Sequence, residues 1–262
     1  MHAAFVNPYG ALGGAVLAAL VALLAYRARS LTRGGAVAAF VVGTVVFGIG
    51  GWSGAAVLFA FFVPSVALSR VGRARKIALS DAGKHGARDA WQVLANGGIA
   101  ALCMAAAPRY GAPAAAAFAA AFAAAAADTW GTEIGTLSRE VPRSILTFAR
   151  IPAGLSGGIT LAGTLATFAG GALVAAVAAG TGVAPFLPVA VGGVAGAFLD
   201  SVLGASLQAL RWCPTCERAC ETNPHRCGTP TTLRRGVGWI ENDAINFAAT
   251  FGGAIVAALL VR

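Results

Sequence analysis

The chain has 262 residues, of which 58% are hydrophobic and only 11% are charged, and its mean hydropathy is +0.75. No soluble domain of this size carries so few charges over so much apolar sequence, so the composition excludes a soluble protein and indicates an integral membrane protein. The net charge of +9 favours anionic partners such as phosphates or lipid headgroups. It does not indicate nucleic acid, because the basic residues stand in short loops between apolar stretches and form no continuous basic face.

Apolar stretches that suit membrane helices recur along the whole chain. A bilayer core of about 30 Å needs roughly 20 mainly apolar residues in a helix. The predicted spans cover residues 10–27, 35–50, 53–69, 90–107, 112–127, 156–180, 184–208 and 243–261. The second and fifth are short, so one of them is a candidate for a re-entrant or tilted segment. We expect an all-α, polytopic membrane protein with about seven or eight transmembrane helices, forming a single domain over residues 1–262.

The distribution of basic residues predicts the orientation of these spans. With eight spans, all of the 19 Lys and Arg residues except Arg109 and Arg262 fall on one side of the membrane. The positive-inside rule makes this side the cytoplasm and puts the N-terminus outside. The residues before the first span carry no Lys or Arg, so we expect no cleavable signal. The sequence therefore predicts a multi-pass protein of the inner (cytoplasmic) membrane.

Ionisable and amide side chains stand at the predicted cytoplasmic ends of the spans. A charge near the bilayer centre costs about 2.5–3.5 kcal/mol on insertion scales, so such groups usually line a polar site. In chain order they are Asp81, Lys84, Arg88, Gln92, Asn96, Asp128, Glu133, Asp200, Gln208, Asp243 and Asn246. Arg88, Gln92 and Asn96 are spaced four apart, which predicts one face of the fourth span. We expect these groups to converge on one cleft that faces the cytoplasm.

This combination of side chains suits phosphate chemistry. Carboxylates are ligands for Mg²⁺, which usually binds through one or two of them together with substrate phosphates. Lys and Arg neutralise phosphate oxygens, and phosphoryl transfer needs little beyond positioning and charge neutralisation. The turn Ser156-Gly157-Gly158, predicted to open the sixth span, offers backbone N–H groups to a phosphate. The sequence has no Walker loop and no protein-kinase signature, so any nucleotide must be held in another way.

Simpler interpretations stay open for several of these residues. Arg73, Arg75 and Lys76 are candidates for binding phosphate, but together with Arg70 they can instead serve only to fix topology and contact anionic lipid. Asp128 and Asp243 can be N-cap or loop residues, and a glycine pair before a helix often serves packing. A structural role is harder to assign to Asp200, which stands well inside an apolar span.

Residues 211–235 form a Cys/His-rich segment that is predicted to be a cytoplasmic insertion. A Cys-x2-Cys pair followed by a His-x-Cys pair offers four soft ligands for tetrahedral Zn²⁺. We predict a structural zinc site in a zinc-ribbon-like loop, with the ligands Cys213, Cys216, His225 and Cys227. Cys220 is spare or takes the place of His225. Free thiols or redox sensing are the alternative, and disulfides suit a reducing compartment less well.

Six motifs, in this order, resemble those of the DUF92 family of integral membrane proteins. They are Asp81-Ala-Gly-Lys84-His-Gly-Ala-Arg88-Asp-Ala-Trp-Gln92-Val-Leu-Ala-Asn96, Ala127-Asp128-Thr129-Trp130-Gly-Thr-Glu133-Ile-Gly135, Pro142-Arg143, Gly157-Gly158-Ile-Thr160, Asp200-Ser201-Val-Leu-Gly204-Ala-Ser-Leu-Gln208 and Glu241-Asn242-Asp243-Ala-Ile-Asn246. The family includes the phytyl-phosphate kinase of tocopherol biosynthesis and the animal transmembrane protein 19. More distantly, two of the motifs resemble dolichol kinase and CDP-diacylglycerol synthase, which also use CTP at a membrane.

The resemblance implies a CTP-dependent kinase that converts a prenyl monophosphate, such as phytyl phosphate, to the diphosphate. It implies that four acids, Asp128, Glu133, Asp200 and Asp243, hold Mg²⁺ and the CTP phosphates. Lys84 and Arg88 would bind the transferring or acceptor phosphates. The further candidates for nucleotide and phosphate binding are Asp81, Asn96, Arg143, Ser156, Gly157, Gly158, Gln208, Asn242 and Asn246. The lysine typical of dolichol-kinase-like Lys-Ser-x-Glu-Gly blocks is absent before Ser156, so cytidylyl transfer to a lipid stays open as an alternative.

Two other functional classes can be weighed against an enzyme. A transporter of lipid phosphates or anions would also keep acids and arginines in its helices, but near the bilayer midplane. Here the charges cluster toward one membrane face, which favours an enzyme served from the cytoplasm. A scaffold protein would leave Asp200 unexplained. The expected partners are the lipid bilayer, a prenyl monophosphate and a nucleoside triphosphate, and a homodimer is compatible with the sequence.

Overall fold

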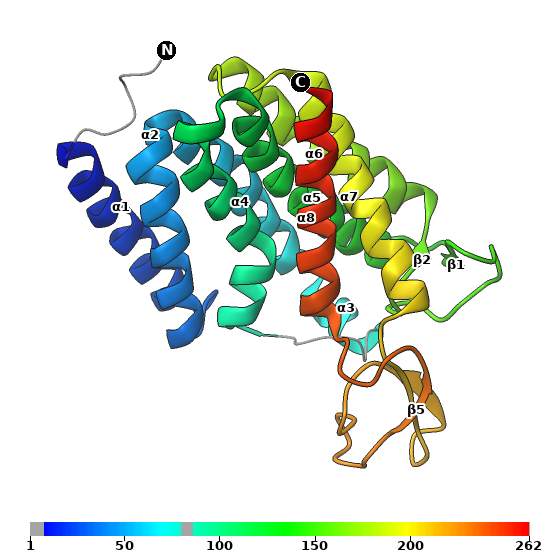
Figure 1. Cartoon of the computed structure of the whole chain (residues 1–262). Coiled ribbons are helices and arrows are strands. Elements are labelled where there is room, and N and C mark those ends of the chain that lie inside the picture. Colours follow the sequence, from blue (N-terminus) through cyan, green and yellow to red (C-terminus); the bar gives the residue numbers. More distant parts are fainter. Residues whose placement is uncertain (1–7, 80–85, 262) are drawn as a thin grey trace.

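The computed structural model describes residues 8–79 and 86–261, and most of them are helical (Figure 1). The long helices are α1 (Pro8–Arg27), α2 (Arg33–Arg70), α4 (Ala90–Tyr110), α5 (Ala112–Leu137), α6 (Leu161–Gly180), α7 (Phe186–Ser206) and α8 (Asn242–Leu260). The short elements are α3 (Arg73–Leu79), β1 (Arg143–Ser144), β2 (Gly158–Ile159), β3 (Leu210–Cys213), β4 (Arg218–Cys220) and β5 (Thr232–Arg235). Six of the described helices are long and apolar enough to cross a membrane, and Leu12–Arg27 is a shorter apolar helix. The prediction of a polytopic, all-α membrane protein is confirmed.

Helix α2 consists of two antiparallel halves. At Gly51, φ is 54° and ψ is −148°, which lies outside the helical region. A Cβ placed on Gly54 would lie 3.0 Å from the carbonyl oxygen of Val46, and the Arg70 guanidinium donates a hydrogen bond to Ser30 Oγ at 2.9 Å. A straight helix of 38 residues would separate its ends by about 57 Å. The chain therefore doubles back at Gly51, and the two halves correspond to the second and third predicted spans.

The connections rich in polar residues lie at one end of the helix bundle. The first turn of α1 and the last turn of α8 lie at the opposite end from α3 and the β3–β5 segment (Figure 1). Strands β4, β3 and β5 form a small antiparallel sheet in that order, and β1 pairs antiparallel with β2. The sheet of β3–β5 stands between α7 and α8 in the chain, within the segment that was predicted as a Cys/His-rich insertion.

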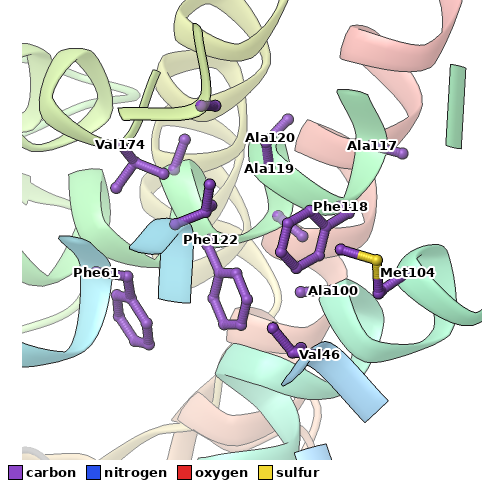
Figure 2. Packing of buried hydrophobic residues seen from close by; sticks show 14 of the residues in the cluster. Val46, Phe61, Ala100, Met104, Ala117, Phe118, Ala119, Ala120, Phe122 and Val174 are labelled. Atoms are coloured by element: carbon purple, nitrogen blue, oxygen red, sulfur yellow. The ribbon is translucent and has the colours of Figure 1, made fainter. Parts of the chain in front are cut away.

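Helix α5 is the central helix of the bundle. It packs against α2, α4, α6, α7 and α8, and nearly every residue from Ala114 to Ala127 is buried. Alanine side chains are small enough for several helices to approach one backbone at once, which is the packing that membrane helices favour. The rings of Phe118 and Phe122 fill the remaining space, and Phe61 stacks on Phe122 with ring centroids 5.5 Å apart (Figure 2).

Glycines bring α6 into close contact with α5. A Cβ placed on Gly163 would lie 2.8 Å from the carbonyl oxygen of Gly131 and 3.0 Å from Thr160 Oγ1. Both distances are shorter than an ordinary van der Waals contact, so even a methyl group would force the two helices apart. This contact lies next to the polar residues in the second half of α5, and it therefore fixes the distance between the helices at that end.

We expect the substitution Gly163→Ala to lower the free energy of unfolding by about 1–3 kcal/mol, the usual cost of overpacking a well-filled contact. Gly180→Ala, on the same helix, is the matched control, because nothing lies within 4 Å of a Cβ at that position; it should change stability by less than about 1 kcal/mol. Thermal unfolding of both variants in detergent measures the difference. Equal melting temperatures would show that α5 and α6 are not in close contact at this point.

Candidate functional site

A cavity of about 600 Å³ opens at the polar end of the bundle, among the ends of α2, α4, α5, α6, α7 and α8. Nine charged residues of the described chain line it: Arg29, Arg70, Arg73, Lys76, Arg88, Asp128, Glu133, Asp200 and Glu221. The cavity also includes the predicted residues Asn96, Ser156, Gly157, Gly158, Asn242 and Asn246. Side chains from stretches that are far apart in the sequence thus meet at one end of the bundle, as expected from the predicted topology.

The packing of α5 against α7 brings Asp128 and Asp200 together. A Cβ on Gly196 would lie 2.6 Å from the Cβ of Ala124, so the two helix backbones are close at this level. Asp128 comes four residues after Ala124, and Asp200 comes four residues after Gly196. Each aspartate therefore lies about one helical turn further along the same face of its helix. The two carboxyl groups lie within hydrogen-bonding reach of each other.

This carboxyl pair fits a divalent cation. Asp200 Oδ2 is buried, and it has no hydrogen-bond partner among the described residues. Two neighbouring buried carboxylates repel each other unless a proton or a cation lies between them. Mg²⁺ commonly binds through one or two carboxylates together with phosphate oxygens. Asp128 and Asp200 are therefore the residues of this cavity that could hold Mg²⁺.

Lys76, which is buried, forms an ion pair with the partly buried Glu133 in the wall of the cavity. Lys76 Nζ lies 2.5 Å from Glu133 Oε2 and donates a hydrogen bond to the carbonyl oxygen of Leu68 at 2.7 Å. Arg75 Nη2 donates to the carbonyl oxygen of Ser138 at 3.1 Å, so two residues of α3 hold that helix against the end of α5. Lys76 was interpreted above as a basic residue that could serve topology alone, and the structure places its charge inside the cavity wall.

Arg88 lies in the wall of the cavity but not on α4. Its N–H donates to the carbonyl oxygen of Ser30 at 2.9 Å, and it precedes the first residue of the helix by two positions. The prediction that Arg88 shares a helix face with Gln92 and Asn96 is therefore wrong, although all three line the cavity. Burial lowers the pKa of the Arg88 guanidinium, and the nearby Glu133 carboxylate opposes this shift. Arginine stays charged even so, because its pKa is far above neutral pH.

The turn at Ser156 is occupied by a carboxylate that the sequence analysis did not identify. Glu221 Oε1 accepts a hydrogen bond from Ser156 N at 2.7 Å, and Glu221 Oε2 accepts from Ser156 Oγ at 2.9 Å and from Gln208 Nε2 at 2.7 Å. Burial raises the pKa of Glu221, while the bonds from Ser156 and the charge of Arg235 oppose the shift. No feature of residue spacing distinguishes Glu221, since it directly follows Cys220 in the Cys/His-rich segment.

Two expectations about this turn need correction. Ser156-Gly157-Gly158 does not open a helix, because Gly158 belongs to β2 and α6 begins after its N-cap residue, Thr160. The backbone N–H of Ser156 is also not open to a phosphate, because Glu221 already accepts from it. Only glycine suits position 157, because its φ of 78° lies in the left-handed region and a Cβ there would overlap with the Cβ of Ala205.

Three further candidates do not line the cavity. Gln208 is buried and bonds to Glu221 instead. Arg143 is exposed, and its Nη1 donates to the carbonyl oxygen of Phe148 at 3.0 Å. Asp243 lies in the first turn of α8, and its neighbours Asn242 and Asn246 line the cavity in its place. Two other candidates, Asp81 and Lys84, lie outside the described residues.

An apolar pocket adjoins the polar cavity. It has a volume of about 70 Å³ and is lined mainly by hydrophobic side chains of α1, α2 and α4. Arg88, Gln92 and Asn96 line this pocket as well as the larger cavity. These three residues therefore belong to the walls of both spaces, and the two spaces lie next to each other.

The Cys/His-rich segment brings its four predicted zinc ligands together. The ligand atoms of Cys213, Cys216, His225 and Cys227 all lie within 4.8 Å of one another. Cys220 is not part of this cluster; its Sγ lies 3.9 Å from the carbonyl oxygen of Thr222. The geometry thus favours His225 over Cys220 as the fourth member.

Comparison with known proteins gives one family and several relatives of similar length. The model of the family described as integral membrane protein DUF92 matches residues 16–254. Protein PGR of Arabidopsis thaliana is 29% identical over 89% of this chain and 90% of its own length. An uncharacterized membrane protein of Synechocystis is 28% identical over 91% and 86% of the two chains, and one of Methanocaldococcus jannaschii is 28% identical over 92% and 90%. No solved structure matches.

Proposed function

The chain belongs to the DUF92 family of integral membrane proteins, and we propose that it is a CTP-dependent prenyl-phosphate kinase. In this reaction an oxygen of a prenyl monophosphate attacks the γ-phosphorus of CTP, the bond to the β-phosphate oxygen breaks, and prenyl diphosphate and CDP are formed. Phytyl phosphate is the proposed acceptor. By the positive-inside rule, the cavity faces the cytoplasm, from which the nucleotide enters.

One observation carries this proposal: a charged cavity and an apolar pocket lie next to each other and share Arg88, Gln92 and Asn96 in their walls. A prenyl phosphate has an anionic head and a hydrocarbon tail, so its two parts match the two spaces. The apolar pocket has room for only a short piece of the tail, and the rest would lie in the lipid. A soluble phosphate ester would gain nothing from the apolar pocket.

The charges in the larger cavity match the needs of phosphoryl transfer. Asp128 and Asp200 would hold Mg²⁺, which when bound neutralises charge on the nucleotide phosphates. Arg88 would bind the acceptor phosphate, because it stands in the walls of both the cavity and the apolar pocket. Arg29, Arg70 and Arg73 provide further positive charge for the nucleotide. The acceptor is already ionised, so the site needs no strong general base.

The direct test is an assay of purified protein in lipid vesicles with Mg²⁺, CTP and prenyl monophosphates of increasing chain length. We expect prenyl diphosphate and CDP as products, and a kcat/KM that rises over the first few carbons of the tail and then levels off, because the pocket holds only a short piece of the tail and each buried methylene contributes about 0.8 kcal/mol. A soluble sugar phosphate is the control acceptor and should give no product. Equal rates with all acceptors would contradict a role for the apolar pocket, and no CDP with any acceptor would contradict the kinase.

A further inference from the structure

The Cys/His-rich segment has almost no apolar core. Across residues 211–235, all of which the structure describes, the buried residues are Cys213, Cys220 and His225. Two of these three belong to the cluster of potential metal ligands. A segment this short cannot bury enough hydrophobic surface to hold its own fold, and natural proteins of this size use metals or disulfides for that purpose.

The geometry of the cluster fits a tetrahedral zinc site. Zn–S bonds of about 2.3 Å in a tetrahedron put two sulfurs about 3.7 Å apart. Cys213 Sγ and Cys227 Sγ lie 3.6 Å apart, and His225 Nδ1 lies 3.1 Å from Cys227 Sγ. Strand pairing sets up this arrangement: Cys213 ends β3 opposite Arg218 of β4, and the intervening turn carries Cys216.

We propose that Cys213, Cys216, His225 and Cys227 bind one Zn²⁺ and that this zinc-bound segment positions Glu221 in the wall of the cavity. Four protein ligands close the coordination sphere, so the metal is structural and takes no part in chemistry. Glu221 directly follows the last residue of β4 and reaches across to Ser156, 65 residues away in sequence. The zinc site would thus support the cavity from outside the membrane helices.

Hydrogen bonds join the two ends of the segment to each other, between the end of α7 and the start of α8. Ala209 N donates to the carbonyl oxygen of Ile240, and Val237 N donates to that of Leu207. Arg211 Nη2 donates to the carbonyl oxygen of Gly238 at 2.7 Å. The sheet therefore cannot rotate freely about its ends, and its internal order decides where Glu221 lies.

The first experiment measures metal in the full-length protein purified without chelators. We expect one zinc per chain, and replacement by Co²⁺ should give the intense visible absorption of a tetrahedral thiolate site. Cys216→Ser should lose most of the bound metal, whereas Cys103→Ala, in α4 and outside the cluster, should keep one zinc per chain. A protein that contains no zinc and takes up neither Zn²⁺ nor Co²⁺ would overturn the proposal, as would a disulfide between two of the four ligands.

The second experiment follows hydrogen exchange at the Ser156 turn. Removal of zinc should increase exchange of the peptide that contains residues 153–160 by at least about tenfold, because the hydrogen bond from Ser156 N to the Glu221 carboxylate is then lost. The Glu221→Gln protein should keep its zinc and show increased exchange in the same peptide. Glu217 is an exposed neighbour in the turn, and Glu217→Gln should change neither the zinc content nor the exchange of this peptide. Unchanged exchange at this turn after complete loss of zinc would overturn the link to Glu221. Both readouts are independent of kinase activity, so they separate this inference from the proposed function.

Discussion

The Asp200→Asn variant is expected to fold normally and to lose at least about a hundredfold in Mg²⁺-dependent transfer from CTP, the scale on which removal of one key electrostatic group slows an enzyme. Asparagine keeps the shape of the side chain but removes its charge. The buried Oδ2 of Asp200 has no hydrogen-bond partner among the described residues, and the asparagine amide can donate a hydrogen bond to the neighbouring Asp128, so the fold should tolerate the change. The measurement is kcat at saturating CTP together with the Mg²⁺ concentration that gives half of the maximal rate.

Glu217→Gln is the control for this variant, since it removes an equal charge from an exposed position outside the cavity. It should leave both kinetic parameters unchanged. Thermal unfolding should show that Asp200→Asn is at least as stable as the wild type, because the loss of one charge relieves the repulsion with Asp128. An Asp200→Asn protein with kcat within threefold of the wild type would remove Asp200 from the proposed magnesium site.

Replacing Arg88 by Met should lower kcat/KM for the prenyl monophosphate by roughly 10- to 100-fold, which corresponds to the loss of one charged hydrogen-bonding group. Methionine removes the guanidinium but has an apolar side chain in place of the arginine stem, so the wall of the apolar pocket should keep its shape. If Arg88 binds the acceptor, KM for the prenyl monophosphate rises much more than KM for CTP. Steady-state kinetics with each substrate varied in turn gives the comparison.

Arg109→Met is the matched control, because Arg109 is exposed in the last turn of α4, at the far end of the same helix. It should change neither KM. An equal rise of both KM values in Arg88→Met would mean that Arg88 does not distinguish the acceptor from the nucleotide. An unchanged kcat/KM would contradict a contact between Arg88 and either substrate.

The architecture and much of the cavity follow from patterns that lie within short stretches of sequence. Apolar length determines the membrane helices, and the break at Gly51 coincides with the predicted gap between the second and third spans. Asp128 directly follows the fifth predicted span, and Asp200 stands about two turns before the cytoplasmic end of the seventh. Because both ends lie on the same side of the membrane, the topology alone brings them to one level of the bundle. Side-by-side placement requires the close packing of Gly196 on Ala124 as well.

The features that could not be predicted depend on contacts between distant segments. Glu221 reaches Ser156 across 65 residues, and nothing in the local sequence shows that the acid takes the backbone N–H that a phosphate was expected to use. The ion pair of Lys76 with Glu133 likewise joins α3 to α5. Arg88 was assigned to a helix face by its spacing, but hydrogen bonding to Ser30 keeps it in an extended segment before α4. A pattern of spacing cannot reveal such a competing partner.

The most direct test of the proposed function follows two labels in CTP with the purified protein, Mg²⁺ and phytyl phosphate in vesicles. A prenyl-phosphate kinase transfers the γ-phosphate, so label at the γ-position should appear in the lipid product while label at the α-position stays in soluble CDP. Lipid product that carries the α-label would instead show cytidylyl transfer, and a chain that transfers neither label would contradict the assignment of this cavity to phosphoryl transfer.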